Sequence, residues 1–194
     1  PTELISLTAF YKLIKNPISR IEVASAGGYL SYENIADKAT VAGVEVEVRK
    51  NLFVRPLSSA ANGMNKLSFG LNGSYIYTNA KMPLATVTTG SQLEGAAPWI
   101  ANFDLSHNFT KGNHSFINTL VLNYVSDKIY TIDTQGYQDI MEQGMMTLDF
   151  VSQAKLNKYV SLTLKARNLL NPSYKLSRKA NENGEKVILN DYKK

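Results

Sequence analysis

The chain has 194 residues, a formal net charge of +5 and no cysteine. It is therefore long enough for one domain with a sizeable core, and it uses neither disulfides nor thiol chemistry. The positive excess is mild and the lysines are scattered, which argues against nucleic-acid binding. No apolar run reaches the roughly 18 residues of a transmembrane helix. No signal peptide precedes the first predicted strand, so we expect either a cytoplasmic protein or an internal piece of a longer chain.

Seven segments alternate apolar and polar residues with a period of two, which predicts β-strands with one apolar and one polar face. These segments are 4–12, 41–49, 66–78, 100–109, 115–125, 145–155 and 160–168. The last is the clearest, and it stops before Asn171-Pro172 because proline supplies no donor to a strand ladder. The stretch 186–192 can begin an eighth strand, and no segment predicts a helix.

The connections between these strands alternate between long and short. Residues 18–39 contain short β-prone pieces around Gly27-Gly28, which predicts a hairpin within a long loop. The other non-strand segments are an irregular connection at 51–65 and predicted loops at 79–98, 126–144 and 175–186. The six connectors are about 28, 17, 22, 5, 19 and 3 residues long. Structureless loops above about 12–15 residues are uncommon in compact soluble domains, whereas outer-membrane barrels have long loops at one end and short turns at the other.

Charged residues in the seven strands all fall on the polar face. They are Lys12, Glu45, Glu47, Arg49, Lys66, Asp104, Asp149, Lys155, Lys165 and Arg167. A charge facing lipid at mid-bilayer costs roughly 2–4 kcal/mol, so a membrane barrel requires this segregation. A soluble β-sandwich also segregates its faces, so the pattern alone leaves both architectures open.

Aromatic residues gather near the strand ends that join the long loops. They are Tyr11, Tyr75, Tyr77, Trp99 and Tyr124. Amphipathic rings are typical of the membrane–water interface, which favours the barrel, although aromatic residues favour strands in general.

A search for metal sites finds only weak candidates. His107 and His114 are the only histidines, and neither has a carboxylate cluster at ligand spacing, which argues against zinc. The loop residues Asp133, Asp139 and Glu142 could meet a calcium ion, but without EF-hand spacing a solvated loop is the better interpretation. We therefore predict no metal and no cofactor.

A search for catalytic groups also ends without a site. Glu45 and Glu47 lie on one face of one strand, but charges balanced by Arg49, or by Lys165 and Arg167, explain them better than an acid/base pair. No phosphate loop and no G-x-S-x-G motif occurs. We therefore predict no catalytic residue, and the substrate-binding residues stay unknown.

Four stretches carry motifs that together point to one family. The stretches are Phe10-Tyr11-Lys12 with Lys15-Asn16-Pro17-Ile18; Tyr32-Glu33-Asn34 with Ala39-Thr40-Val41-Ala42-Gly43-Val44-Glu45; Leu93-Glu94-Gly95-Ala96-Ala97-Pro98 leading into Asn102; and Asn168-Leu169-Leu170-Asn171-Pro172-Ser173-Tyr174. Together they resemble the TonB-dependent outer-membrane receptors, with features of the versions found in Bacteroidota. The fourth stretch is the most specific, and the resemblance spans nearly the whole chain.

The resemblance implies an all-β fold, an antiparallel up-and-down meander that is part of a large transmembrane β-barrel. It implies that 1–194 is a single segment from the C-terminal strands of the barrel, without the plug, the TonB-contacting segment and the closing strand. It implies location in the outer membrane of a Gram-negative bacterium. The function would be active import of a scarce nutrient, an iron chelate, cobalamin or a glycan, and not enzymatic catalysis. The implied partners are outer-membrane lipid, the TonB complex and a small nutrient ligand.

Two other functions stay open from the sequence: a soluble β-sandwich that binds a ligand, and a small self-contained outer-membrane barrel with a structural role. The barrel interpretation makes two structural predictions. The seven strands should form one antiparallel meander in chain order, since short hairpin turns force sequential neighbours to pair. Apolar residues spread over five strands should lie on the convex, lipid-facing side, namely Leu71, Phe103, Leu122, Phe150 and Leu162.

Overall fold

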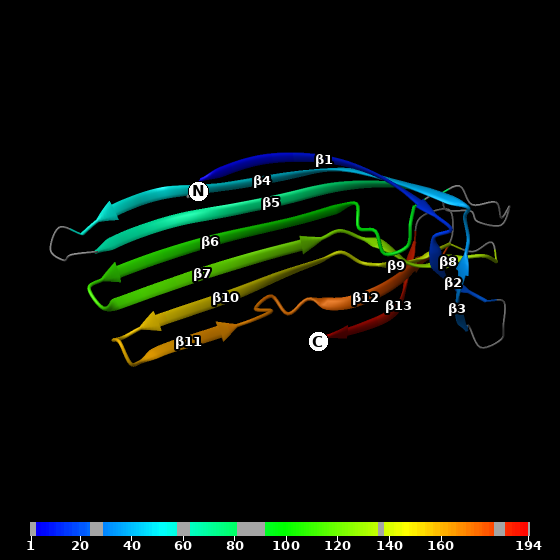
Figure 1. Ribbon diagram of the computed structural model, residues 1–194. Coiled ribbons are helices and arrows are strands. Elements are labelled where there is room, and N and C mark those ends of the chain that lie inside the picture. Colours follow the sequence, from blue (N-terminus) through cyan, green and yellow to red (C-terminus); the bar gives the residue numbers. More distant parts are fainter. Residues whose placement is uncertain are drawn as a thin grey trace.

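The computed structural model describes residues 3–23, 29–57, 63–80, 92–135, 138–180 and 185–193. Its main feature is a seven-stranded sheet, here called the wall, with the order β1-β4-β5-β6-β7-β10-β11 (Figure 1). The strands are β1 (Leu4–Lys15), β4 (Lys38–Pro56), β5 (Met64–Ala80), β6 (Trp99–Lys111), β7 (His114–Val125), β10 (Met145–Lys155) and β11 (Ser161–Ala166). Every neighbouring pair is antiparallel. The predicted meander of seven strands in chain order is therefore confirmed.

The wall is longer at β4 than the sequence pattern predicts. β4 runs to Pro56 instead of ending at Arg49, so the predicted irregular connection over 51–65 is wrong for residues 51–56 and 64–65. A register shift between Asn51 and Phe53 inserts one extra residue into the ladder with β5. Such a β-bulge changes the phase of the alternation, and this ended the period-two pattern although the strand continues.

A second sheet of six strands lies at the end of the wall that carries the long connections, and we call it the loop-end sheet (Figure 1). Its order is β13-β12-β9-β8-β2-β3. The strands are β2 (Ile18–Glu22), β3 (Leu30–Asn34), β8 (Lys128–Asp133), β9 (Ile140–Glu142), β12 (Ser173–Lys179) and β13 (Lys186–Lys193). The predicted hairpin at 18–39 is confirmed as the antiparallel β2–β3 pair, while Gly27-Gly28 lies outside the described residues. The predicted eighth strand is confirmed as β13, which pairs with β12.

The predictions of loops at 126–144 and 175–186 are wrong where β8, β9 and β12 occur. Strands β8 and β9 prolong the β7–β10 hairpin: Val125 pairs with Met145, and Lys128 pairs with Glu142 in the same register. Strand β12 likewise prolongs β11, because the Leu169 N–H donates to Leu148 and the Gln143 N–H donates to Lys175. The interruptions between these pieces hid them, since each piece is too short to show a period by itself.

The registers place the apolar residues of the wall on one face, here called the apolar face. One continuous row crosses six strands: Ile5, Val48, Leu71, Phe103, Leu122 and Leu148. Phe150 and Leu162 belong to parallel rows of this face, so the five predicted residues share it. The side chains remain open to the surroundings, with Ile5 82% and Leu7 72% exposed. The opposite, polar face carries rows such as Ser6, Glu47, Asn72, Asn102, Asn123 and Thr147.

One correction concerns charges on the apolar face. The bulge and the extension of β4 place Lys50 opposite Phe69 and Arg55 opposite Asn65, both on the apolar face near the short turns. The expected absence of charge therefore holds for the predicted strand bounds but not for the whole strand.

Buried side chains concentrate in and next to the loop-end sheet. One cluster joins Ile21, Ile35, Ile129 and Ile132 with Met141. A second joins Ala36, Ala39, Ala80 and Leu93. Among the described residues, no helix is long and apolar enough to cross a membrane.

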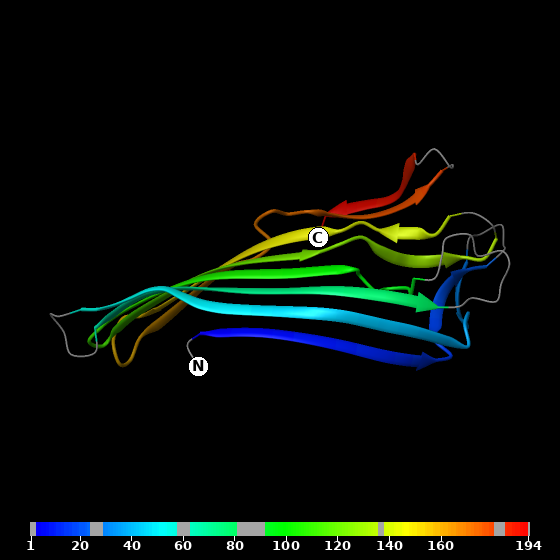
Figure 2. The same cartoon turned by 90° about the horizontal axis from the view of Figure 1, so that it is seen from above.

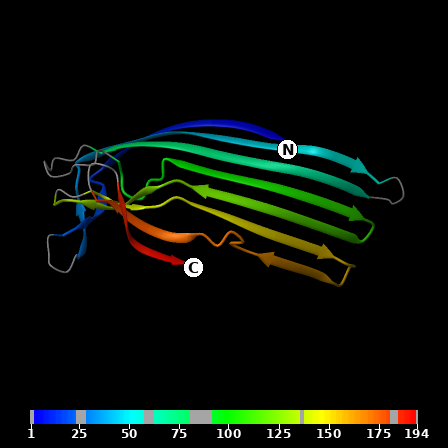
Figure 3. The same cartoon turned by 180° about the vertical axis from the view of Figure 1, so that it is seen from behind.

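The wall is curved and open (Figure 2). Strand β1 lies at one side of the curve and the β12–β13 hairpin at the other, and from behind the short turns lie opposite the loop-end sheet (Figure 3). Within the described residues β1 pairs only with β4, so the wall does not close on itself.

Candidate ligand-binding site at the loop end

A gap in the wall creates room for a site. Strand β6 begins only at Trp99, whereas its neighbour β5 continues to Ala80 and its other neighbour, β7, continues into β8. The gap therefore lies between the end of β5 and β8. The segment before β6 occupies the gap: Leu93 N–H donates to Thr78 Oγ1 at 3.0 Å, and Gly95 N–H donates to the Ile129 carbonyl at 2.9 Å. Gly95 has φ +75°, a conformation that glycine adopts without steric cost. The segment therefore bridges β5 and β8 without adding a strand.

The β2–β3 hairpin is fixed to β8 at this end of the molecule. β2 and β8 pair in parallel through Ile21 with Ile132 and Glu22 with Asp133. The Arg178 guanidinium forms an ion pair with Glu22, which ties the hairpin to β12. The hairpin, which follows β1 in the chain, thus crosses to a strand on the far side of the gap.

Arg20 is the second anchor of this hairpin. Its guanidinium lies 3.7 Å from Glu94 Oε1 and 4.3 Å from the ring centroid of Tyr130, while its backbone N–H donates to Glu94 Oε2 at 2.7 Å. Burial lowers the pKa of Arg20, but the hydrogen bond to Tyr32 and the nearby Tyr and Glu94 groups outweigh it, so the pKa is raised overall. Arg20 therefore stays charged and connects the hairpin both to β8 and to the segment before β6.

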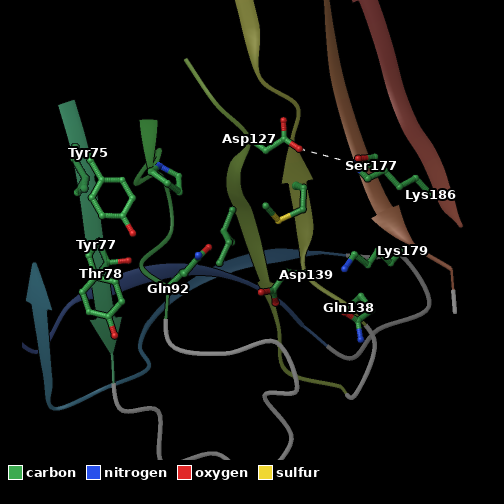
Figure 4. A pocket seen from close by; sticks show the side chains of 14 residues that line it. Tyr75, Tyr77, Thr78, Gln92, Asp127, Gln138, Asp139, Ser177, Lys179 and Lys186 are labelled. Carbon is green, nitrogen blue, oxygen red and sulfur yellow. Dashed lines mark ion pairs between the residues drawn. The ribbon is translucent and has the colours of Figure 1, made fainter. Parts of the chain in front are cut away.

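A cavity of about 720 Å³ opens between β5 on one side and β12–β13 on the other (Figure 4). This volume is within the range of small-molecule sites, which are typically about 300–1,000 Å³. Its polar and aromatic lining is Tyr75, Tyr77, Thr78, Gln92, Asp127, Gln138, Asp139, Ser177, Lys179 and Lys186, and its apolar lining is Ile76, Pro98, Ile129 and Met141. Rings, amides, hydroxyls and ammonium groups together suit a ligand that carries many hydrogen-bonding groups.

The interruption between β7 and β8 places Asp127 in this cavity. The Asp127 carboxylate accepts the Gly144 N–H at 2.6 Å and lies 3.7 Å from Lys186 Nζ, so it links two sides of the site (Figure 4). A side chain at position 144 would meet the backbone, since a Cβ there would lie 2.8 Å from the Val125 carbonyl oxygen. Glycine at this position therefore allows the backbone at 144 to approach the backbone at Val125 closely.

The three loop residues considered for calcium have different partners in the structure. Asp139 Oδ1 accepts the Asp133 N–H at 2.9 Å, and Asp133 Oδ2 accepts the Gln135 N–H at 3.0 Å. Glu142 instead pairs with Lys128 at 3.2 Å. Both aspartates are buried, so the expectation of a solvated loop is wrong for them. Each aspartate accepts a backbone N–H, and the described residues contain no group of three such side chains that could hold a metal.

Tyr174 adds a further link at this end. Its hydroxyl donates to Glu142 Oε2 at 3.3 Å. Burial and then the charge of Glu142 raise the pKa of the Tyr174 phenol to about 12, so it keeps its proton at neutral pH.

The remaining candidates from the sequence lie in the wall, away from the cavity. Glu47 Oε1 accepts from Arg49 Nε at 2.7 Å, which is the charge balance expected for this glutamate. His107 Nε2 lies 2.8 Å from Asn65 Oδ1 on the apolar face, and His114 begins β7 beside a short turn. None of these residues contributes to the cavity.

Sequence analysis identified no ligand-binding residue, and the cavity explains why. Its lining comes from β5, from the segment before β6, and from β8, β9, β12 and β13, which are neighbours in the loop-end sheet. The gap lets β5 of the wall face these four strands. Tyr75, Tyr77 and Trp99 belong to the predicted interface girdle, and the rings of Tyr75 and Trp99 are in tilted contact, with centroids 4.5 Å apart. Tyr75 and Tyr77 also line the cavity, so the girdle prediction contained two of its residues.

The class of the protein follows from the wall and from comparison with known families. Residues 2–169 match the family described as TonB dependent receptor-like, beta-barrel. This match covers most of the sequence, and the chain belongs to this family of TonB-dependent receptor β-barrels. The family is one of outer-membrane receptors and transporters in Gram-negative bacteria. No curated protein and no solved structure matches the chain.

Proposed function

We propose that residues 1–194 form part of the barrel wall of an active nutrient importer in the outer membrane, with no enzymatic activity. The observation that carries the proposal is the exposed apolar face of the wall, with rows of large side chains such as Ile5 and Leu7 left uncovered. A sheet that belongs in water covers such a face with a second layer, whereas a sheet in lipid leaves it open. This favours the barrel over the soluble β-sandwich.

The open edges favour a large barrel over a small self-contained one. A closed eight-stranded barrel would pair its first strand with its last, whereas β1 and β13 lie in different sheets of the described structure. In our proposal, further strands pair with these edges, a plug fills the lumen, and the TonB complex supplies the energy for import. Support for the plug and for TonB comes from family membership alone.

Spin labels test which face meets lipid. Labels at Leu71, Phe103, Leu122, Phe150 and Leu162 of the full-length protein in a bilayer should be accessible to lipid-soluble oxygen. Labels at Asn72 and Asn123, on the polar face, are the matched controls. Preferential quenching of the first set by a water-soluble nickel chelate would overturn the proposal.

We further propose that the loop-end cavity contributes to ligand capture. Lys179 and Gln138 line the cavity, and Lys179 has no ion pair with another described residue. Calorimetric titration with ferric citrate, cobalamin and a malto-oligosaccharide tests the three ligand classes. Lys179→Ala should weaken binding of the active probe about tenfold, as for loss of a charged hydrogen bond. Lys158→Ala removes the same charge in the turn before β11 and should leave binding unchanged.

A further inference from the structure

The apolar face carries a band of polar residues near the short turns. The band contains Lys50, Arg55, Asn65, His107, Asn118 and Ser152. The register fixes their side: Leu67 pairs with His107, His107 with Asn118, and Asn118 with Ser152. Lys50 and Arg55 pair with Phe69 and Asn65 on the same face. A polar band on the face proposed to meet lipid needs a polar partner there.

The band is organised by hydrogen bonds between neighbouring strands. His107 Nε2 and Asn65 Oδ1 are 2.8 Å apart, and Ser152 Oγ donates to Asn118 Oδ1 at 2.7 Å. The Arg55 guanidinium lies over the Phe53 ring, 5.6 Å from its centroid, and its N–H groups are donors that suit an anion. The neutral members satisfy part of their hydrogen bonding within the band, and the two cations lie at one side of it.

The charge of the band is positive. In β4, β5, β6, β7 and β10 no Asp or Glu lies in the rows of the apolar face. Glu3, just before β1, is in line with Lys50 in the β1–β4 register, and its carboxylate accepts the Asn51 N–H at 3.3 Å. With Lys50 and Arg55 against Glu3, the band and its neighbour keep one net positive charge. An anion is therefore the complementary partner.

The position of the band along the wall agrees with a membrane surface. On β5, the band extends from Asn65 to Phe69, the partner of Lys50, and Tyr75, whose ring contacts Trp99, lies six residues beyond Phe69. At about 3.4 Å per residue and a tilt of about 40°, the band is about 10 Å deep along the barrel axis, and the rows from Phe69 to Tyr75 add about 16 Å. The apolar rows with Leu71, Phe103 and Leu122 lie between the band and Tyr75, so the band borders the apolar zone.

From these observations we infer that the band is a binding site for the phosphate of an anionic membrane phospholipid, whose acyl chains lie along the apolar rows above it. Lys50 and Arg55 hold the phosphate, while His107 and Asn118 offer hydrogen bonds to the glycerol and headgroup. The inference rests on the proposed lipid contact of the apolar face and adds a specific headgroup to it.

Lipid retention on the full-length protein tests the site. The protein is exchanged into detergent micelles with equal amounts of phosphatidylglycerol and phosphatidylethanolamine, and retained lipids are counted by native mass spectrometry. Lys50→Gln with Arg55→Gln should lower retained phosphatidylglycerol about 25-fold, because each basic group near a membrane surface contributes roughly a fivefold gain in affinity for anionic lipid. Retained phosphatidylethanolamine should not change.

The matched control is Lys66→Gln with Lys155→Gln, which removes the same charge near the same turns but on the polar face. Equal loss of phosphatidylglycerol in both double variants, or no loss in either, overturns the inference. Heat-modifiable gel migration checks folding, and Lys50→Gln alone, with about a fivefold loss expected, replaces a double variant that fails to fold. A spin label at Leu122 that meets oxygen while lipid retention is unchanged refutes the headgroup site but not the lipid-facing wall.

Discussion

The carboxylate of Asp104 occupies the space that a Cβ atom on Gly70 would fill. The two residues pair directly between β5 and β6, and Gly70 also pairs with Arg49 on β4. The glycine thus lets an acid on one strand lean toward a cation two strands away, and the charge of Asp104 acts on Arg49. Glu47 pairs with the same guanidinium. Charge on the polar face is therefore balanced across the wall and not only within a strand.

This relationship predicts the effect of adding a methyl group. Gly70→Ala should lower the free energy of unfolding of the full-length protein by about 1–3 kcal/mol, because the Asp104 carboxylate must leave its position. Gly73→Ala is the matched control on the same strand, since nothing lies within 4 Å of a Cβ there. The control should be neutral or slightly stabilising because alanine loses less backbone entropy on folding than glycine. Urea unfolding in micelles measures both, and equal effects would contradict the packing argument.

The Arg178–Glu22 pair predicts a local effect at the loop end. Glu22→Gln should loosen the β2–β3 hairpin by about 1–3 kcal/mol, since it removes the negative charge that pairs with a half-buried guanidinium. Hydrogen exchange should then become at least about fivefold faster in residues 18–22 and 128–133 and stay unchanged in the wall. Asp191→Asn removes the more exposed Lys175–Asp191 pair. It should change the free energy of local opening, measured by hydrogen exchange, by less than about 0.5 kcal/mol. Uniform acceleration throughout the chain would instead indicate global destabilisation.

Tyr174 predicts a pH dependence. Its pKa is about 12 in the folded protein, against about 10 in an unfolded chain. The folded state therefore binds the phenolic proton more tightly, so the contribution of Tyr174 to stability is complete below pH 10 and is lost as the pH rises to 12. The difference in unfolding free energy between the natural protein and Tyr174→Phe should shrink across this interval. A difference that stays constant from pH 9 to pH 12 would show that the phenol is not held by burial and Glu142.

The sequence predicted the wall well because each wall strand has two different surroundings. Neighbouring residues such as Leu122 and Asn123 point to opposite faces of the wall, one apolar and one polar. The period of two therefore appears directly in the sequence. The loop-end sheet lacks this contrast: β8 is half-buried or buried along its whole length, and β9 has only three residues. Neither strand shows a period by itself.

The candidate site depends on contacts that no local pattern encodes. Pairing of Ile21 with Ile132 joins residues that are far apart in the chain, and in parallel, so no hairpin rule predicts it. The two cations of the band were missed for two reasons: Lys50 lies just outside the predicted strand, and Arg55 lies beyond the bulge between Asn51 and Phe53. His107 lies within the predicted strand 100–109, and the register puts it on the apolar face with Leu67.

The open edges of the wall lead to the last prediction. Strand β11 ends the wall on one side and β1 on the other, and neither has a second partner strand among the described residues. Unpaired backbone groups in lipid cost several kcal/mol each, so an open sheet of this length is unstable in a bilayer. Residues 1–194 alone should therefore neither form a uniform pore nor import a ligand, and both properties should appear only when further strands pair with the edges. Planar-bilayer recordings of purified residues 1–194 should show no stable, uniform single-channel currents. Such currents from a monomer would mean that the chain closes on itself, and a small self-contained barrel would then replace the importer wall as its function.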